Sequence, residues 1–400
     1  MSRTRPRAAA AHVLPADAAL DCWAVTHPGV EAITARELVG LGIVPGAMEP
    51  GGVAFQADGR GMRAANLHLR TASRVLVRIG DFRASAFSEL ERRSRHLPWE
   101  RFVAPGSALR FRVTSRKSRL YHQDAVAERL LAIAGRTVPG LSPAVAAAVG
   151  DDADAADVTP RGDEQLIVVR IVRDRCLVSV DTSGELLHRR GYRLAVARAP
   201  LRETLAAAML LGVGWDGSAP LVDPFCGSGT IPIEGALIAR RIPPGIDRRF
   251  GFERWPGFES ADWEEESARA RAGILPAAGV PIVASDRDAG AVEAASANAA
   301  RAGVAGNVEV RRAPVSAAAV PVAPGWIVTN PPYGARVGER LRLRDLYAQL
   351  GHVVRRLPPG WRIALLSAHA DLEAQTGLPF EPVLETANGG IRVRLVQAAP

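Results

Sequence analysis

The second half of the chain contains short, continuous apolar runs separated by longer segments of helical periodicity. The runs at 221–222, 280–284 and 326–328 each lead into polar residues, and helical patterns occupy 231–240 and 289–302. Strands that are apolar throughout are typical of parallel sheets, because helices cover both faces of such a sheet. The pattern predicts an α/β fold with a Rossmann-like, doubly wound sheet.

The end of this domain has a different pattern. A helix is expected at 346–357 and a strand at 361–367, and a Gly-Gly pair after Asn388 leads into a strand at 391–396. A two-residue glycine turn between strands is typical of a hairpin. We therefore expect an antiparallel final hairpin in a domain that covers residues 186–400.

The first half mixes strands and helices in smaller units. Apolar and polar residues alternate strictly at 74–79, which predicts a strand with one wet face. Further strands are expected at 23–25 and 51–55, and a helix at 59–69. These elements predict a small α+β module over residues 19–80.

A second α+β module is expected over residues 81–185. Its strands are predicted at 108–114, 165–172 and 175–181, and its main helix at 123–133. The two N-terminal modules and the C-terminal domain together account for a chain of 400 residues, which exceeds the usual size of one domain.

Charge and composition give weaker information. The formal net charge is +8, which favours a polyanionic partner such as nucleic acid. However, Lys117 is the only lysine, while arginine and alanine are abundant, and this is typical of a bias in the nucleotide composition of the genome. Basicity is therefore only weak support for a nucleic-acid partner.

The cysteines and the apolar runs exclude several classes of protein. Cys22, Cys176 and Cys226 are isolated, without the spacing of a disulfide framework or a zinc site. No apolar run reaches the ~20 residues of a membrane span, and residues 1–18 are expected to form a disordered tail. We expect a cytoplasmic protein with no metal and no membrane partner.

The most informative motif is Asn-Pro-Pro-Tyr-Gly, which begins at Asn330 where an apolar run ends. The prolines stiffen the turn and remove backbone donors, so the carbonyl of Pro331 is free to accept a hydrogen bond. The Asn330 side-chain oxygen and this carbonyl can each accept one hydrogen of a planar amine, and Tyr333 can stack on the ring that carries it. The alternative is a plain turn, since Asn-Pro and Pro-Pro are common in loops.

A glycine-rich turn follows the run that ends at Asp223. Gly227 and Gly229 allow the backbone to approach a ligand closely at the first strand-to-helix crossing of a parallel sheet. Pro232 stands where the dinucleotide fingerprint requires a small residue, and no Gly-Lys-Ser/Thr sequence follows. A pyrophosphate is therefore not expected, and adenosine with a short amino-acid tail fits better.

A second carboxylate, Asp286, stands at the end of the next predicted strand. An acid in this place is positioned to accept both ribose hydroxyls of a nucleoside. The alternative is that it caps the following helix, a role that we assign to Asp288 because it stands directly before the helical pattern.

Taken together, the motifs at 223–230, 285–288 and 330–336 resemble those of the class I, S-adenosylmethionine-dependent RNA methyltransferases that carry a THUMP domain. The resemblance extends to the segments 181–193 and 199–204, and so covers nearly the whole chain. It implies that residues 19–80 are a ferredoxin-like module, 81–185 a THUMP RNA-binding domain, and the remainder the methyltransferase domain.

The resemblance also implies roles for individual residues. The amine site would consist of Asn330, Pro331 and Tyr333. The cofactor, S-adenosyl-L-methionine, would be bound by Asp223, Phe225, Gly227, Gly229, Thr230, Asp286 and Pro200.

Three basic segments are candidates for contacts with structured RNA. Arg116, Lys117 and Arg119 lie in a loop before a predicted helix, where cations and helix N-terminal amides favour phosphate oxygens. Arg189 and Arg190 lie in the segment before the methyltransferase domain. A merely solvated loop and a surface linker are the respective alternatives. Arg336 follows the Asn-Pro-Pro-Tyr motif, where it could contact the target phosphate or order the loop.

Two features depart from the simplest expectation. The family places an acid after the third strand of the sheet to meet the adenine of the cofactor, whereas this chain has Ala313 and Pro314 there, so that backbone or Ser316 would have to hold the base. An aromatic insertion at 241–272 is expected to cover the carboxyl edge of the sheet as a small satellite core.

The expected reaction is methylation of the exocyclic N2 amine of a guanosine in structured RNA, with 23S ribosomal RNA as the expected substrate and transfer RNA as the alternative. The motif alone also accepts adenine, cytosine or a glutamine amide, so an amine methyltransferase acting on DNA or protein is a rival. An RNA-binding assembly factor with an inactive methyltransferase fold is the alternative from another class.

Overall fold

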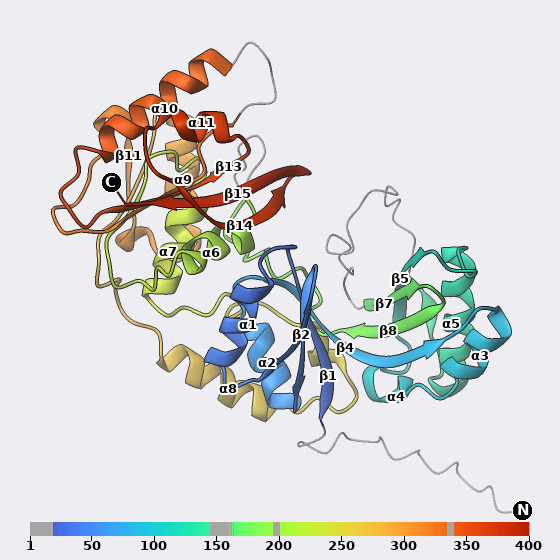
Figure 1. Ribbon diagram of the computed structural model, residues 1–400. Helices are drawn as coiled ribbons and strands as arrows, with labels where there is room; N and C mark the ends of the chain where they lie inside the picture. Colours follow the sequence, from blue (N-terminus) through green and yellow to red (C-terminus); the bar gives the residue numbers. More distant parts are fainter. Residues whose placement is uncertain are drawn as a thin grey trace, which may run out of the picture.

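The computed structural model describes residues 19–144, 160, 162, 164–194, 201–333 and 340–399. Its described elements form two mixed sheets of eight and seven strands (Figure 1). The predicted tail at 1–18 lies outside the described residues. The two sheets belong to different halves of the chain.

The N-terminal half forms the eight-stranded sheet, in the order β2-β3-β1-β4-β8-β7-β5-β6. Its elements are β1 (Leu20–Thr26), α1 (Glu31–Gly40), β2 (Pro45–Glu49), β3 (Gly52–Ala57), α2 (Gly59–His68), β4 (Ala72–Arg83), α3 (Phe87–Ser94), α4 (Trp99–Phe102), β5 (Ala108–Arg116), α5 (Gln123–Thr137), β6 (Ser142–Pro143), β7 (Glu164–Val172) and β8 (Arg175–Asp181).

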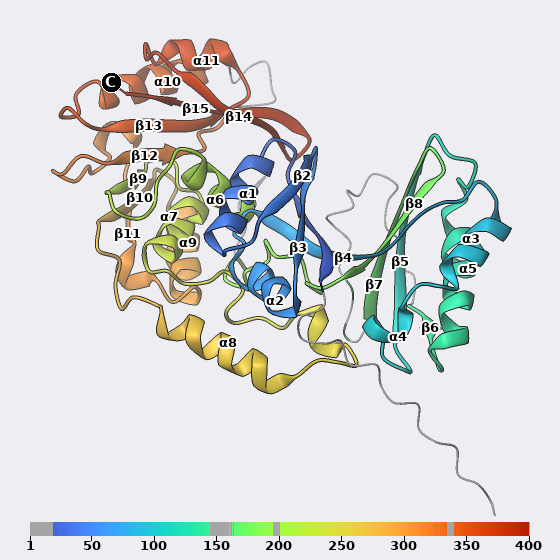
Figure 2. The same cartoon turned by 60° about the horizontal axis from the view of Figure 1, so that its bottom comes forward.

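Strand β4 is common to both N-terminal modules (Figure 2). It pairs with β1 through residues 72–77 and with β8 through residues 76–83, so the sheet continues from one module into the other. The boundary expected at residue 80 therefore falls inside a strand. Buried side chains from both modules form one apolar cluster, which includes Val77, Trp99 and Val180.

The C-terminal half forms the seven-stranded sheet, in the order β11-β10-β9-β12-β13-β15-β14. Its elements are α6 (Glu203–Gly212), β9 (Leu221–Asp223), α7 (Thr230–Ala239), η1 (Gly251–Arg254), α8 (Ser260–Ala272), β10 (Ile282–Asp286), α9 (Ala289–Arg301), η2 (Ala305–Asn307), β11 (Glu309–Arg312), η3 (Val315–Ala317), β12 (Trp326–Thr329), α10 (Arg340–Val354), β13 (Arg362–Ser367), α11 (Ala370–Gln375), β14 (Glu381–Asn388) and β15 (Ile391–Ala398).

The first five strands of this sheet are parallel, and β15 and β14 complete it as an antiparallel hairpin. Every residue of β9 and β12 is buried, as expected for strands covered on both faces, whereas β1 alternates between buried and partly exposed residues. The doubly wound sheet with its final hairpin is confirmed.

The aromatic insertion does not lie where the sequence predicted. Phe250, Phe252 and Trp255 are buried in the apolar cluster of the N-terminal half rather than over the carboxyl edge of the seven-stranded sheet. The Phe252 amide donates to the Thr182 carbonyl (3.0 Å), and Arg63 on α2 binds Glu266 on α8 (2.6 Å). The insertion packs there because the N-terminal sheet offers apolar surface that its aromatic side chains can bury.

Candidate functional site

Three strand ends meet at one edge of the seven-stranded sheet. Strand β9 lies between β10 and β12, and all three are parallel, so Asp223, Asp286 and Asn330 follow neighbouring carboxyl ends. The chain leaves β9 toward β10 and later returns to β12 on the other side. Ligands of open α/β sheets bind at such a switch point.

The loop between β9 and α7 has the backbone that its glycines predict. Gly227 and Gly229 have φ of +52° and +85°. A Cβ on Gly227 would meet no atom within 4 Å, whereas a Cβ on Gly229 would lie 3.0 Å from the Cβ of Ala295 on α9. Gly227 therefore leaves open space above the loop for a ligand, while Gly229 allows α7 and α9 to pack closely.

The other predicted cofactor residues of this loop are more enclosed. Phe225 is half-buried and packs against the apolar cluster that contains Val222 and Val283. Thr230 is buried at the first position of α7. Pro200 lies outside the described residues.

Asp223, a predicted cofactor residue, makes internal hydrogen bonds in the structure. Its side chain is 1% exposed, and its Oδ1 accepts hydrogen bonds from Thr329 Oγ1 (2.6 Å) and from the Phe225 amide (3.1 Å). Burial raises the pKa of this carboxyl to about 7, against the smaller opposing effect of the two hydrogen bonds. Asp223 thus joins the glycine loop to the strand that precedes Asn330.

Asp286 is half-exposed beside the same loop. Its Oδ2 accepts from the Gly227 amide (3.1 Å) and its Oδ1 from the Asp288 amide (3.0 Å). Each carboxylate oxygen keeps a further lone pair, so both remain able to accept hydroxyl donors. The prediction that Asp288 caps the helix is confirmed, since its Oδ1 accepts from the Ala291 amide at the start of α9 (2.8 Å).

The Asn-Pro-Pro-Tyr motif leaves a buried acceptor unused. Oδ1 of Asn330 is buried and has no hydrogen-bond partner among the described residues. Such an atom costs free energy unless a ligand supplies a donor. Pro331 is buried beside it, and Tyr333 is half-buried, with its Oη accepting from Asn388 Nδ2 (2.7 Å).

The region expected to meet adenine contains no acid. The Ala313 amide already donates to the Asp286 carbonyl (3.0 Å), so this backbone donor of the segment is not free for adenine. Ser316 is exposed on η3. Within the described site, Ser316 remains the polar side chain available on this segment.

The predicted RNA residues divide into two groups. Arg116, Lys117 and Arg119 are exposed at the end of β5, and Arg189 is exposed beside Glu185. The prediction for Arg190 is wrong, because its side chain is only 3% exposed. It faces Glu234 Oε1 (3.4 Å) and donates to the Arg70 carbonyl (2.7 Å), which places it between the two halves of the protein. Arg336 lies outside the described residues.

Sequence reasoning missed two polar residues of the site. Thr329 was taken only as the end of an apolar run, although a hydroxyl in an otherwise apolar strand indicates a buried partner. Asn388 was recognised only as part of a turn. Neither contact could be predicted, because the partners lie 106 and 55 residues away along the chain.

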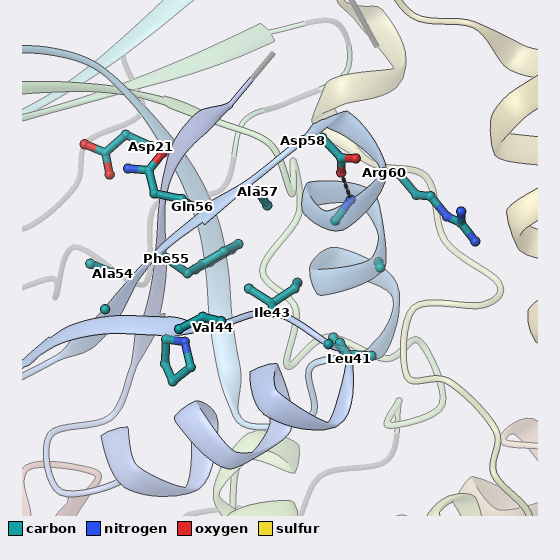
Figure 3. A pocket seen from close by; sticks show the side chains of 15 residues that line it. Asp21, Leu41, Ile43, Val44, Ala54, Phe55, Gln56, Ala57, Asp58 and Arg60 are labelled. Atoms are coloured by element: carbon teal, nitrogen blue, oxygen red, sulfur yellow. Dashed lines mark hydrogen bonds between the residues drawn. The ribbon is translucent and has the colours of Figure 1, made fainter. Parts of the chain in front are cut away.

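The described surface also has a groove of about 820 Å³ that is separate from this edge (Figure 3). All its lining residues belong to the first module and come from β1, the end of α1, β2, β3 and the start of α2. Asp58 in its wall caps α2 by accepting from the Gly61 amide (2.7 Å). The groove contains none of the residues predicted for the cofactor, the amine or RNA.

In the described ranges, no three His, Cys, Asp or Glu side chains gather in an arrangement that could hold a metal ion. Among the helices that the structure describes, none combines the length and apolar character that crossing a membrane demands.

The fold and the site define a class I methyltransferase that uses S-adenosylmethionine. The parallel sheet, the open space above Gly227, the half-exposed carboxylate of Asp286 and the unused acceptor of Asn330 all fit this cofactor and an amine substrate. The chain belongs to the family of the RMKL-like methyltransferase domain, which matches residues 190–389. The RlmL ferredoxin-like domain matches residues 21–76.

Curated relatives agree in sequence over most of the chain. A Synechocystis sp. protein with the provisional name RNA methyltransferase slr0064 is 32% identical, over 94% of this chain and 95% of its own length. The ribosomal RNA large subunit methyltransferase K/L of Methylococcus capsulatus is 34% identical over 94% of this chain. The chain spans 50% of the length of that K/L protein.

Solved structures agree in fold. SMU.472, provisionally named a methyltransferase and solved as a complex with SAH, has a TM-score of 0.84 at 28% identity and covers 95% of this chain and 98% of its own. A Listeria monocytogenes protein described as a predicted N6-adenine-specific DNA methylase has a TM-score of 0.82 at 31% identity, covering 96% of this chain and 97% of its own.

Proposed function

We propose that the protein transfers a methyl group from S-adenosylmethionine to the exocyclic N2 amine of a guanosine in structured RNA, and that this RNA is 23S ribosomal RNA. The observation that carries the amine assignment is the buried Oδ1 of Asn330, which has no hydrogen-bond partner in the part of the chain that the structure describes. The choice of ribosomal RNA rests on relatives named ribosomal RNA large subunit methyltransferases, of which the chain spans about half.

The chemistry requires alignment more than acid or base catalysis. Bound S-adenosylmethionine supplies an electrophilic sulfonium methyl. Asn330 Oδ1 and the Pro331 carbonyl accept the two amine hydrogens and stabilise the positive charge that grows on nitrogen as it attacks. The N–C bond forms as the C–S bond breaks, S-adenosylhomocysteine leaves, and the extra amine proton passes to water. Tyr333 stacks on the target base.

On the cofactor side, Asp286 accepts the ribose hydroxyls and Gly227 gives the backbone room to approach. Asp223 stabilises the loop by accepting a hydrogen bond from the Phe225 amide. Pro200 and Thr230 remain proposals from the family pattern. These assignments give the methyl donor and the amine adjacent places at the β9–β12 switch point.

Residues 81–185 are proposed to act as a THUMP RNA-binding domain, with a basic tip as the phosphate contact. The tip comprises the exposed cations Arg83, Arg116, Lys117, Arg119, Arg173 and Arg175. Asp174 joins its segments, because its Oδ1 accepts from the Arg119 amide (2.8 Å) and its carbonyl from the Ala84 amide (2.8 Å).

Backbone strain also marks this tip. Lys117, Arg173 and Asp174 are three of the four non-glycine residues with positive φ in the described part of the chain. Left-handed backbone at non-glycine residues is uncommon and persists where the surroundings hold it. The tip therefore presents its cations on a held backbone rather than on a loose loop, which suits phosphate contacts.

The likeness to a protein described as a DNA adenine methylase favours one alternative, N6-methylation of adenine in DNA. The amine site does not distinguish the two bases, because both carry an exocyclic amine on a planar ring. Transfer RNA is the alternative substrate within the RNA class. The decisive experiment therefore has to offer all three nucleic acids.

The test uses purified protein, labelled S-adenosylmethionine, and 23S rRNA, transfer RNA or DNA, with nucleosides analysed by mass spectrometry. We expect N2-methylguanosine from 23S rRNA. Asn330→Ala should lower kcat by about 100-fold or more, while the affinity for the cofactor stays unchanged. Methyladenine in DNA, or methylation confined to transfer RNA, would overturn the substrate assignment. An Asn330→Ala variant with wild-type kcat would overturn the amine site.

A further inference from the structure

The aromatic residue of the amine site is held by a contact from the far end of the domain. Asn388 donates its side-chain amide to the Tyr333 Oη over 2.7 Å. The Tyr333 ring packs against Leu343 and Tyr347 of α10 and Leu372 of α11. These apolar contacts support the ring, and the hydrogen bond from Asn388 fixes the position of its polar end.

The turn itself does not require asparagine at position 388. The two central residues of the β14–β15 turn are Gly389 and Gly390, with φ of +56° and +81°, as a type I′ turn demands. Asn388 is the last residue of β14, pairs with Ile391 across the hairpin, and is not among the residues with positive φ. The geometry of the turn therefore explains the two glycines. It does not explain asparagine at position 388, whereas the hydrogen bond to Tyr333 does.

The hairpin that carries Asn388 is itself held in place. Strand β14 pairs along its length with β15, which pairs with the buried strand β13. On its other side, Gly29 of the N-terminal half lies so close that a Cβ there would be 1.8 Å from the Glu385 carbonyl oxygen. A donor on this hairpin thus has a fixed position relative to the sheet.

We propose that Asn388 is a positioning residue for the methyl-transfer reaction, which orients the Tyr333 ring for stacking on the target base. This inference rests on the proposed amine site at Asn330 and Tyr333. Asn388 acts through Tyr333, because its side-chain amide donates to the Tyr333 Oη. Loss of the hydrogen bond leaves the ring in place but free to tilt, so that fewer bound bases reach the aligned geometry.

The experiment is a double-mutant cycle on the full chain with the RNA that the protein methylates. Asn388→Ala and Tyr333→Phe each remove one side of the same hydrogen bond. Each should lower kcat by about 3- to 10-fold and leave the KM for S-adenosylmethionine unchanged. The double variant should be no slower than either single variant, because both changes remove one interaction.

Two controls separate positioning from damage to the hairpin. Tyr333→Phe leaves the turn sequence intact, so its effect cannot come from a distorted turn. Ile391 is the cross-strand neighbour of Asn388 and is 43% exposed. The Ile391→Ala variant should keep wild-type kcat. Additive losses in the cycle, a wild-type kcat for Asn388→Ala, or an equal loss in Ile391→Ala would each overturn the proposal.

Failure of this inference is distinguishable from failure of the proposed function. If Asn330→Ala loses activity while Asn388→Ala does not, the amine site stands and the positioning role falls. If Asn330→Ala retains wild-type kcat, the amine site falls and takes the Asn388 role with it.

Discussion

At Asp223 a single carboxyl group contacts both parts of the proposed site, the cofactor loop and the strand that precedes Asn330. Its Oδ1 accepts hydrogen bonds from the loop proposed to hold the cofactor and from Thr329, the residue directly before Asn330. The group is buried, and Asp286 adds a further negative charge nearby, so that its pKa rises to about 7. The site therefore contains a carboxyl group that titrates near neutral pH within the fold.

This titration predicts a pH-dependent stability. The native carboxyl keeps its proton up to about pH 7, whereas the unfolded chain loses it near the ordinary value of 3.8. Between these values the native state binds more protons, so the free energy of unfolding falls as pH rises. Between pH 5 and pH 8 the wild type should lose about 2–4 kcal/mol of unfolding free energy through this titration. The Asp223→Asn side chain stays neutral, so the variant should not show that loss.

Urea denaturation of both proteins at several pH values measures this difference. Glu203, whose pKa burial also raises to about 7, contributes the same pH dependence to wild type and variant and cancels in the comparison. Parallel curves for the two proteins would show that Asp223 does not titrate in this range.

The site residues that could be predicted are those whose position follows from the local sequence pattern. Asn330 and Asp286 follow apolar strands, and strand ends in a parallel sheet converge by rule. Arg190 was not predictable, because its burial depends on Glu234, 44 residues further along the chain. A basic residue beside a tyrosine has the same sequence pattern whether it meets phosphate or an internal carboxylate.

Among the elements, β4 and β8 decide how the N-terminal half is built. Two ion pairs join these strands. Arg74 and Asp181 are each 1% exposed and lie 2.7 Å apart, whereas Arg175 and Asp81, also in contact, are 65% and 46% exposed. The same pair of strands thus offers a buried and an exposed ion pair for comparison.

Removal of the buried arginine should be far more damaging. Arg74→Leu leaves the Asp181 charge buried without its cation and should cost about 3–5 kcal/mol of unfolding free energy. Arg175→Leu breaks a solvated pair and should cost no more than about 1 kcal/mol. Urea denaturation measures both losses, and equal losses in the two variants would contradict this assignment.

The strands and helices themselves were largely predictable, while their tertiary partners were not. The continuous apolar run at 326–328 correctly predicted a strand covered on both faces. The run at 74–79 does form a strand, but the wet face predicted for it is wrong, because residues 74–77 are all buried and Arg74 pairs there with the buried Asp181. The insertion that contains Phe250 and Phe252 was recognised as a packed unit but assigned to the wrong surface. Aromatic content indicates that a segment will be buried without saying against which surface.

For the whole molecule, the two halves are joined along more than one contact. Arg36 of α1 donates to the Leu211 carbonyl (3.1 Å), Arg190 donates to the Arg70 carbonyl (2.7 Å), and Gly29 lies against β14. The position of one half relative to the other therefore depends on the close contact between Gly29 and the β14 backbone as well as on hydrogen bonds.

Two glycines provide a matched test of the contact between Gly29 and β14. Gly29 and Gly42 both have positive φ, so alanine strains each by a similar amount, about 1 kcal/mol. Only at Gly29 would the new Cβ collide with β14, whereas nothing lies within 4 Å at Gly42. Gly29→Ala should accelerate hydrogen–deuterium exchange in β14 and lower methyl transfer, and Gly42→Ala should do neither. Equal behaviour of the two variants would show that this contact does not hold the halves together.

The shared strand β4 holds the proposed RNA-binding tip at a fixed distance from the first module. A sheet that runs unbroken from the first module to the basic tip cannot bend there without breaking backbone hydrogen bonds. The first module in turn lies against β14 of the C-terminal half at Gly29, so the protein sets the distance from the tip to the proposed amine site. An RNA would then be selected by whether it can place phosphates and a flipped base at that separation at the same time. Sequence around the methylated nucleotide would matter less than the length and stiffness of the helix that leads to it.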